Sequence, residues 1–160
     1  LIVRGFDLVT IGLIVGLYQV VWGVSQLFTG ALSDRVGRKL PIVAGMWLMS
    51  VGIAIATYAN SLIFFYVSSS VTGLGMALVY PTLLAGVADE ANPTERGAVL
   101  GVYRLWRDSG YGFGALFLGI VADLSGVVSA FYVSTFILLA SGFLVLILMQ
   151  GRKPQLLIRG

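Results

Sequence analysis

The amino-acid sequence predicts an all-α integral membrane protein with five transmembrane helices, in a single membrane domain over residues 1–160. Hydrophobic residues make up 58% of the chain and charged residues only 11%, whereas about 25% of the residues of a soluble domain are charged. Five predominantly apolar stretches each reach the roughly 20 residues that a helix needs to cross a bilayer. A soluble protein of this size would need a polar shell that this sequence cannot form. The expected surroundings of the helices are therefore a lipid bilayer.

Prolines and charged residues set the bounds of these helices. Pro41 falls in the first turn of the second helix, where the missing N–H leaves no helical hydrogen bond unmade. Pro81 lies inside the third helix and predicts a kink in its later half. The expected helices are residues 8–31, 40–59, 62–88, 93–124 and 127–149, and a basic tail follows at residues 150–160.

The fourth helix has a start signal of its own. Asn92 is a residue that can cap a helix, Pro93 suits the first helical position, and Glu95 falls at the third, as in a capping box. We therefore expect this helix to begin at Pro93, with its first turn exposed to water.

The residue types that the chain lacks exclude several kinds of chemistry. It contains no cysteine and no histidine, so disulfides, thiolate nucleophiles and the usual zinc sites are not expected. We expect neither a metal nor a cofactor. An enzyme is not expected either, because no serine has a recognisable base. The formal charge of +3 comes from basic residues scattered over the loops, which argues against a nucleic-acid partner.

The distribution of lysine and arginine predicts the orientation in the membrane. Cytoplasmic loops of membrane proteins are enriched in these residues. They occur after the first and third helices and in the tail, whereas the loops at 58–61 and 124–126 have none. We therefore expect the N-terminus outside and the C-terminus in the cytoplasm. The basic residues on the predicted cytoplasmic side are Arg35, Arg38, Lys39, Arg96, Arg152, Lys153 and Arg159.

The fourth helix carries a charged face near its middle. Arg104, Arg107, Asp108 and Tyr111 are spaced as i, i+3, i+4 and i+7, so they share one side of a helix. A charge at this depth costs about 2.5–3.5 kcal/mol on insertion scales and is expected to face an interior cavity. Arg104 and Asp108 can pair within the helix, which would leave Arg107 for an anion. The face indicates a substrate or proton pathway, or else an ion pair that locks this helix to a neighbour.

Polar residues are spread unevenly over the other helices. Gln19, Trp22 and Gln26 form a polar and aromatic stripe on the first helix, which suits substrate contact and interhelical hydrogen bonding equally well. The second and fifth helices have no charge and are expected to face lipid, while the first, third and fourth face protein or water. Small residues four apart are expected to pack the fourth helix closely against a neighbour. They are Gly97 with Gly101, Gly110 with Gly114, and Ala115 with Gly119.

The first charged cluster, residues 30–39, reads G-A-L-S-D-R-V-G-R-K and is expected to form a loop between the first two helices. It resembles the signature of the major facilitator superfamily, in which placed glycines, a leucine, an Asp-Arg pair and a Gly-Arg-Lys run join two transmembrane helices. A loop that is merely basic would not explain the glycines or Asp34. The matching residues are Gly30, Leu32, Asp34, Arg35, Gly37, Arg38 and Lys39.

The resemblance implies half of a twelve-helix major facilitator fold. The signature follows the second helix of each half. The C-terminal half is favoured because Ser69 stands four residues before Gly73, where the first half usually has an arginine. Residues 101–116 also look like the eleventh helix of bacterial members. The glycine-proline pattern of drug antiporters is missing, so the resemblance gives drug efflux no specific support.

The same resemblance implies a mechanism and partners. A small-molecule substrate would cross by alternating access, with the signature as a cytoplasmic gate. Asp34 would face a helix of an N-terminal helical bundle that this chain lacks, so we expect a fragment of a longer transporter in a bacterial inner membrane. Asp108 is the best candidate for proton coupling. The alternatives are a noncatalytic membrane subunit or scaffold and, less favoured, an intramembrane enzyme.

Overall fold

The computed structural model describes residues 6–150, and every regular element in this range is a helix. The expected tail residues Arg152, Lys153 and Arg159 lie outside the described residues. The five helices follow the sequence order and agree with the expected number. They are α1 (Leu8–Val36), α2 (Lys39–Tyr58), α3 (Leu62–Glu90), α4 (Arg96–Ser125) and α5 (Val127–Leu148).

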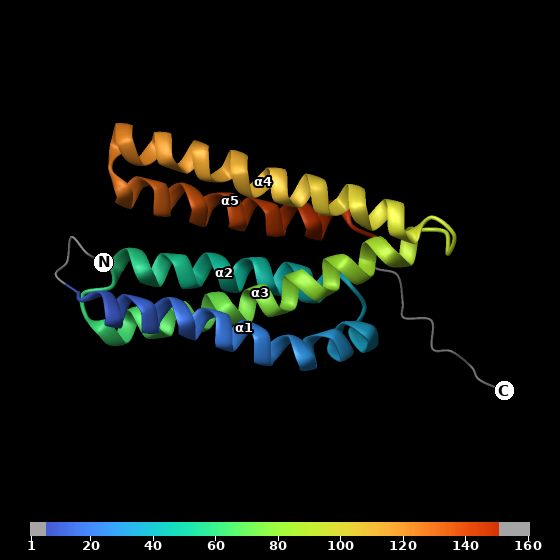
Figure 1. Cartoon of the computed structure of the whole chain (residues 1–160), viewed down its shortest axis with the longest axis horizontal. Coiled ribbons are helices and arrows are strands. Elements are labelled where there is room, and N and C mark those ends of the chain that lie inside the picture. The colour runs from blue at the N-terminus through green and yellow to red at the C-terminus, as the bar shows by residue number, and fades with distance from the viewer. Residues whose placement is uncertain (1–5, 151–160) are drawn as a thin grey trace.

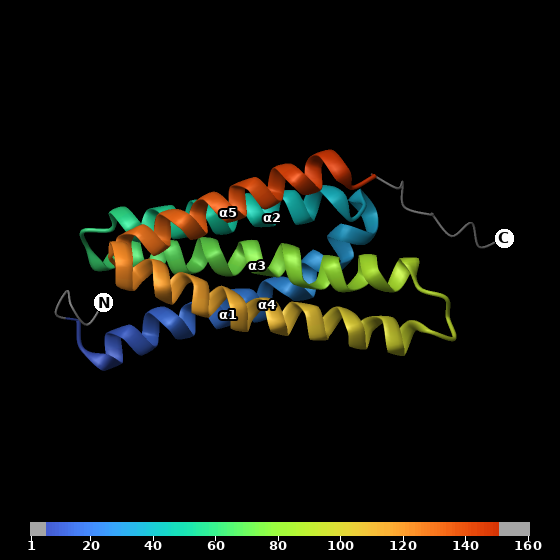
Figure 2. The ribbon, with the colours of Figure 1, turned by 90° about the horizontal axis from the view of Figure 1, so that it is seen from above.

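The helices run roughly along one axis and alternate in direction (Figure 1). The first three form one group, in which α3 packs against both α1 and α2. α5 packs on α2, and α4 and α5 meet at the turn that joins them and diverge toward their other ends, as the perpendicular view shows (Figure 2). The 37–38 turn, the 91–95 loop and the end of α5 therefore lie at one end of the bundle. The loops around residues 59–61 and 126 lie at the other.

Two helix bounds differ clearly from the expected ones. α1 continues to Val36 instead of ending at residue 31, so most of the signature is helical and the loop is only Gly37 and Arg38. Gly37 ends the helix with a φ of 87°, a conformation that costs a glycine little. The expected start of α4 at Pro93 is also wrong. Residues 93–95 form a turn closed by Glu95 N–H donating to the Asn92 carbonyl at 2.9 Å, and α4 begins at Arg96.

Four helices, α1, α2, α3 and α5, are long and apolar enough to cross a membrane by length and composition. α4 has 30 residues, but its charged and small residues make it the least apolar of the five. The expectation that α2 faces lipid is wrong for much of its surface. α2 lies between α3 and α5 and has six buried residues, because its small side chains let the neighbouring helices approach.

Close packing of backbones occurs between α2 and α3. A methyl group added to Gly45 would lie 2.6 Å from the carbonyl oxygen of Gly75, and one added to Gly75 would lie equally near that of Gly45. The glycines of α4 were the expected packing positions, and this expectation is wrong within residues 6–150. A methyl group at Gly101 or Gly114, for example, would meet nothing within 4 Å. The spacing of small residues thus shows that a neighbouring helix could approach closely. It does not show which helices pack in this way.

Buried serines join the helices by hydrogen bonds to backbone carbonyls. The Ser69 hydroxyl of α3 donates to the Ile14 carbonyl of α1, and the Ser68 hydroxyl donates to the Gly52 carbonyl of α2 at 2.7 Å. Ser50 of α2 donates to the Thr135 carbonyl of α5 at 2.9 Å. These bonds fix the relative positions of four helices without placing a charge in the apolar interior.

Pro81 does not interrupt α3, because another helix supplies the missing donor. A proline at position 81 cannot donate to the carbonyl four residues earlier, which belongs to the fully buried Ala77. The Thr29 hydroxyl of α1 donates to that carbonyl at 2.6 Å. Transmembrane helices tolerate proline where a neighbouring threonine satisfies the freed backbone group in this way.

We predict that Thr29→Val destabilises the protein by about 0.6–1.7 kcal/mol, the range measured for interhelical hydrogen bonds in membranes. In a Pro81→Ala background, Thr29→Val should change stability very little. The alanine that replaces the proline has an N–H that can donate to the Ala77 carbonyl. A double-mutant cycle of unfolding in mixed micelles measures this coupling. Equal losses in the two backgrounds would contradict the assigned role of Thr29.

Candidate functional site

A cavity of about 480 Å³ lies in the middle of the bundle, and all five helices contribute to its wall. Its lining is mostly aromatic and aliphatic. Three of the chain's four methionines, Met46, Met49 and Met76, line it together with four of the seven tyrosines. The tyrosines are Tyr18, Tyr80, Tyr103 and Tyr111. A largely apolar cavity with a few polar groups is the usual form of a small-molecule site.

Arg107 is the charged residue of this lining, and its guanidinium is fixed by two neighbours. Nε donates to Asp108 Oδ1 at 2.8 Å, and Nη1 donates to the Tyr80 hydroxyl of α3 at 3.2 Å. The guanidinium also lies over the Tyr80 ring, 5.4 Å from its centroid. Arg107 is thus the α4 arginine that lines the cavity. Its contact with Tyr80 also ties α4 to α3.

The expected pair of Arg104 with Asp108 is wrong. Asp108 pairs with its sequence neighbour Arg107, and Arg104 is exposed without an ion pair inside residues 6–150. The reason is the position of Tyr80, which draws the Arg107 guanidinium toward α3 and leaves its Nε beside Asp108. The Asp108 side chain is 60% exposed, and Asp108 is not among the residues that line the cavity.

Only part of the polar and aromatic stripe on α1 lines the cavity. Gln19 and Trp22 line the cavity, whereas Gln26 does not. Trp22 packs edge-on against Tyr80, with ring centroids 5.6 Å apart. Its indole N–H is buried and has no hydrogen-bond acceptor among the described residues. An unmade hydrogen bond of this kind costs about 1–3 kcal/mol.

Sequence reasoning missed Tyr103 and the three methionines of the lining. Tyr103 precedes Arg107 by four residues, so helical spacing could have placed it on the same face. No such signal exists for the methionines, because Met46 and Met49 come from α2 and Met76 comes from α3. Their position depends on how the helices pack.

The signature residues form a second polar cluster at the end of the bundle that holds the 37–38 turn. Arg38 donates to Asp34 at 2.6 Å, to Ser33 Oγ at 2.7 Å and to Asp89 of α3 at 2.9 Å. Ser33 is buried, and its hydroxyl donates to the Gly30 carbonyl at 2.9 Å. Arg38 thereby joins the ends of α1 and α3, and neither Ser33 nor Asp89 was singled out from the sequence.

The electrostatics of this cluster keep Arg38 charged. Partial burial lowers the pKa of Arg38, but its hydrogen bonds to Asp89 and Asp34 outweigh that effect, so the pKa is raised above its ordinary value.

The other signature side chains are directed outward. Leu32 is 45% exposed, and Arg35 is exposed on the last turn of α1. A methyl group added to Gly30 would meet nothing within 4 Å.

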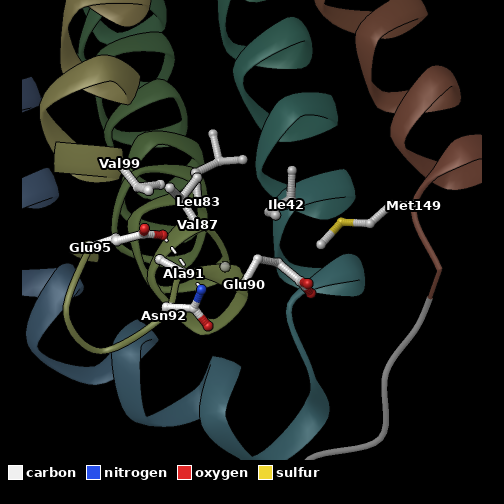
Figure 3. Close-up of a pocket in the computed structure, with 10 residues that line it drawn as sticks. Ile42, Leu83, Val87, Glu90, Ala91, Asn92, Glu95, Val99 and Met149 are labelled. Carbon is white, nitrogen blue, oxygen red and sulfur yellow. Dashed lines mark hydrogen bonds between the residues drawn. The ribbon is translucent and has the colours of Figure 1, made fainter. Parts of the chain in front are cut away.

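A smaller cavity of about 390 Å³ lies near the same end, between α2, α3 and the start of α4 (Figure 3). Its wall is apolar and includes Ile42, Leu83 and Met149. Asn92 and Glu95 lie at its edge and point toward each other, with Asn92 Nδ2 donating to Glu95 Oε2 at 3.5 Å. Among the described residues, no three acidic side chains are grouped as metal ligands here or elsewhere.

Comparisons with known proteins match this chain over most of its length. A family model described as Major Facilitator Superfamily matches residues 3–158. An uncharacterized MFS-type transporter from Methanocaldococcus jannaschii is 31% identical over 127 residues, which are 79% of this chain and 33% of that protein. Multidrug resistance protein MdtH from Yersinia enterocolitica is 33% identical over 112 residues, which are 70% of this chain and 28% of that protein. The chain spans about a third of the length of these relatives.

Proposed function

Because the chain belongs to the major facilitator superfamily, we propose that it is the C-terminal half of a secondary transporter that moves a small solute by alternating access. The observation that carries this proposal is the 480 Å³ cavity, to which all five helices contribute and in which Arg107 is the charged group. Two bundles that rock about such a site expose it to each side of the membrane in turn.

The partner in this proposal is an N-terminal helical bundle. α4 supports its existence, because none of its described residues is buried and its glycines face open space. A second bundle against this face would cover the charged residues Arg104 and Asp108, which are costly to expose to lipid. The fragment would then form one wall of the pathway, and the second bundle would form the other.

The proposed orientation follows from the charged end of the bundle. Arg38, Lys39 and Arg96 lie at the end that holds the 37–38 turn and the start of α4, and basic residues favour the cytoplasmic side. The C-terminus would then be cytoplasmic and the start of α1 would lie outside. The similarity to a Yersinia enterocolitica protein supports a bacterial inner membrane as the location.

The test of this function uses the full-length gene product in proteoliposomes and a panel of radiolabelled solutes. This chain contains no cysteine, so Gln19→Cys introduces a thiol at the cavity wall into it. A thiol reagent should block transport in this variant, and the transported solute should protect the thiol. Val20→Cys is the matched control, because Val20 is 61% exposed and does not line the cavity.

A protein that moves none of these solutes, and whose Gln19→Cys and Val20→Cys variants react alike, would contradict the proposed function. That result would favour a noncatalytic membrane subunit or scaffold.

The signature cluster is proposed to act as the cytoplasmic gate. Asp34→Asn removes one of the two carboxylates that hold Arg38, while Asp89 remains. An exposed ion pair contributes about 0.2–1 kcal/mol, so we predict a shift of the inward-open to outward-open ratio of up to about fivefold. Labelling of single cysteines at both ends measures this ratio. Asp123→Asn is the control, because Asp123 is exposed near the opposite end of α4. Equal labelling of the two variants would argue against a gate.

A further inference from the structure

We propose that the solute bound in the central cavity is an organic monoanion with an aromatic or branched aliphatic body, and that Arg107 binds its anionic group. This inference rests on the proposed transport function and names the substrate class of the same site. It follows from the charge of the lining, from the hydrogen-bond donors that remain unused there, and from the shape and chemistry of the wall.

The charge that the described lining residues carry is positive. Arg107 is its charged residue, and no carboxylate is among the lining residues that the structure describes. Asp108 balances Arg107 from outside the cavity wall, where its side chain is 60% exposed. A ligand inside the cavity therefore meets the cation and not the anion of this pair. In an apolar surrounding, such a charge favours an anionic group over a neutral one.

Arg107 has hydrogen-bonding capacity left for this group. A guanidinium has five N–H donors, and only Nε and one Nη1 hydrogen have partners among the described residues. The remaining three, one on Nη1 and two on Nη2, have no partner among the described residues, and adjacent guanidinium N–H groups suit the two oxygens of a carboxylate. Asp108 accepts from Nε, so it orients the guanidinium without using these three donors.

The same cavity lining contains two further donors. The Tyr80 hydroxyl accepts a hydrogen bond from Arg107, so its own proton remains available to an acceptor. The Trp22 indole N–H is buried without an acceptor in the described part of the chain, and its ring packs against Tyr80. Donors thus outnumber acceptors at this side of the cavity. An anion supplies acceptors only, and it would satisfy groups that these residues leave unpaired.

The rest of the wall suits an apolar body. Met46, Met49 and Met76 offer flexible, polarizable side chains, and Val79 and Leu138 add aliphatic surface. The volume of about 480 Å³ is within the range of sites for drug-sized molecules. An inorganic anion such as phosphate would leave this apolar surface unused. The body of the ligand is therefore expected to be aromatic or branched aliphatic.

The rival ligand class is an organic cation. Tyrosine and tryptophan rings attract cations through their faces, and four tyrosines line the cavity with Trp22. Arg107 already occupies the Tyr80 ring at 5.4 Å, however, and would repel a second cation next to it. No carboxylate among the described lining residues would offset that repulsion. The geometry therefore favours the anion.

The test compares three probes of nearly equal size and shape. They are 1-naphthoate, 1-naphthylmethanol and 1-naphthylmethylammonium, which are anionic, neutral and cationic. Binding to the purified full-length protein is measured by equilibrium dialysis at pH 7. A charge-assisted hydrogen bond contributes enough to expect that 1-naphthoate binds about tenfold or more tighter than either of the other probes.

The decisive variant is Arg107→Met with Asp108→Asn, which removes the cation and its partner together and leaves the net charge unchanged. This double variant should bind the three probes within about twofold of one another, because the anion preference is then lost. Arg96→Met is the matched control. Arg96 is on the first turn of the same helix, exposed and outside the cavity lining, so its replacement should preserve the tenfold preference.

The outcomes separate this inference from the proposed function. Tighter binding of the cationic or neutral probe, or an anion preference that survives in the double variant, overturns the inference while a solute site remains. Protein that binds no probe and transports no solute contradicts the proposed function as well. Solute transport without binding of 1-naphthoate overturns the inference alone.

Discussion

Replacing Gly75 with alanine is expected to destabilise the bundle by about 3 kcal/mol, at the upper end of the usual cost of overpacking. The added methyl group would lie 2.6 Å from the Gly45 carbonyl oxygen and 2.8 Å from the Met49 amide nitrogen. Both atoms belong to the backbone of α2, which cannot move aside like a flexible side chain. The two helices would have to separate, and the hydrogen bond of Ser68 to Gly52 would be strained with them.

Unfolding of the purified protein in mixed micelles measures this effect. Gly12→Ala is the matched control, because a methyl group there meets nothing within 4 Å and alanine has the higher helix propensity by about 1 kcal/mol. Gly12→Ala should therefore be neutral or slightly stabilising. Equal stability of the two variants would contradict the close α2–α3 contact.

Asp108→Asn is expected to abolish solute accumulation driven by a proton gradient while passive exchange continues. Asp108 accepts a hydrogen bond from Arg107 Nε at 2.8 Å, so a proton taken up by Asp108 would remove the negative charge beside the guanidinium and strengthen its attraction for an anion. Proton uptake and anion binding would then favour each other, as linkage requires. Asparagine cannot carry the proton, and the coupling would be lost.

Proteoliposomes with and without an imposed pH gradient measure accumulation, and solute counterflow measures passive exchange. Asp108→Glu serves as the conservative control, because it keeps a carboxyl group that can take up a proton. We expect it to retain part of the gradient-driven accumulation. Unchanged active transport in Asp108→Asn would remove Asp108 from the coupling mechanism.

The number, order and approximate length of the helices could be predicted from the sequence, because a helix in lipid must be apolar and its apolar residues are contiguous in the sequence. Each spanning helix must be apolar over most of its length, and the charges that interrupt these stretches mark the loops. The predicted helix bounds are wrong where the same residues suit either a helix or a turn. Asn92, Pro93 and Glu95 suit a helix start, but the chain uses them in a turn that precedes Arg96. Residues 32–36 are polar enough for a loop and nevertheless extend α1.

For the candidate site, helical spacing could predict which residues share a face but not what that face meets. Arg107, Tyr111, Gln19 and Trp22 line the central cavity. Arg104, Asp108 and Gln26 do not line it. The partner of Asp108 could not be chosen correctly from spacing alone, since Tyr80 of α3 decides where the Arg107 guanidinium lies.

The sequence by itself determined that this is a helical membrane chain with a family signature between its first two helices, because hydropathy and motif residues are local properties. Only the tertiary structure decided which helices touch, since glycines on α2, α3 and α4 look alike in sequence but only some meet a neighbouring backbone. It also decided that Thr29 supplies the hydrogen bond that Pro81 cannot make, and that residues from five helices line one cavity. The cavity lining brings together residues up to 120 positions apart in the chain, such as Tyr18 and Leu138, and no periodicity along the chain encodes this arrangement.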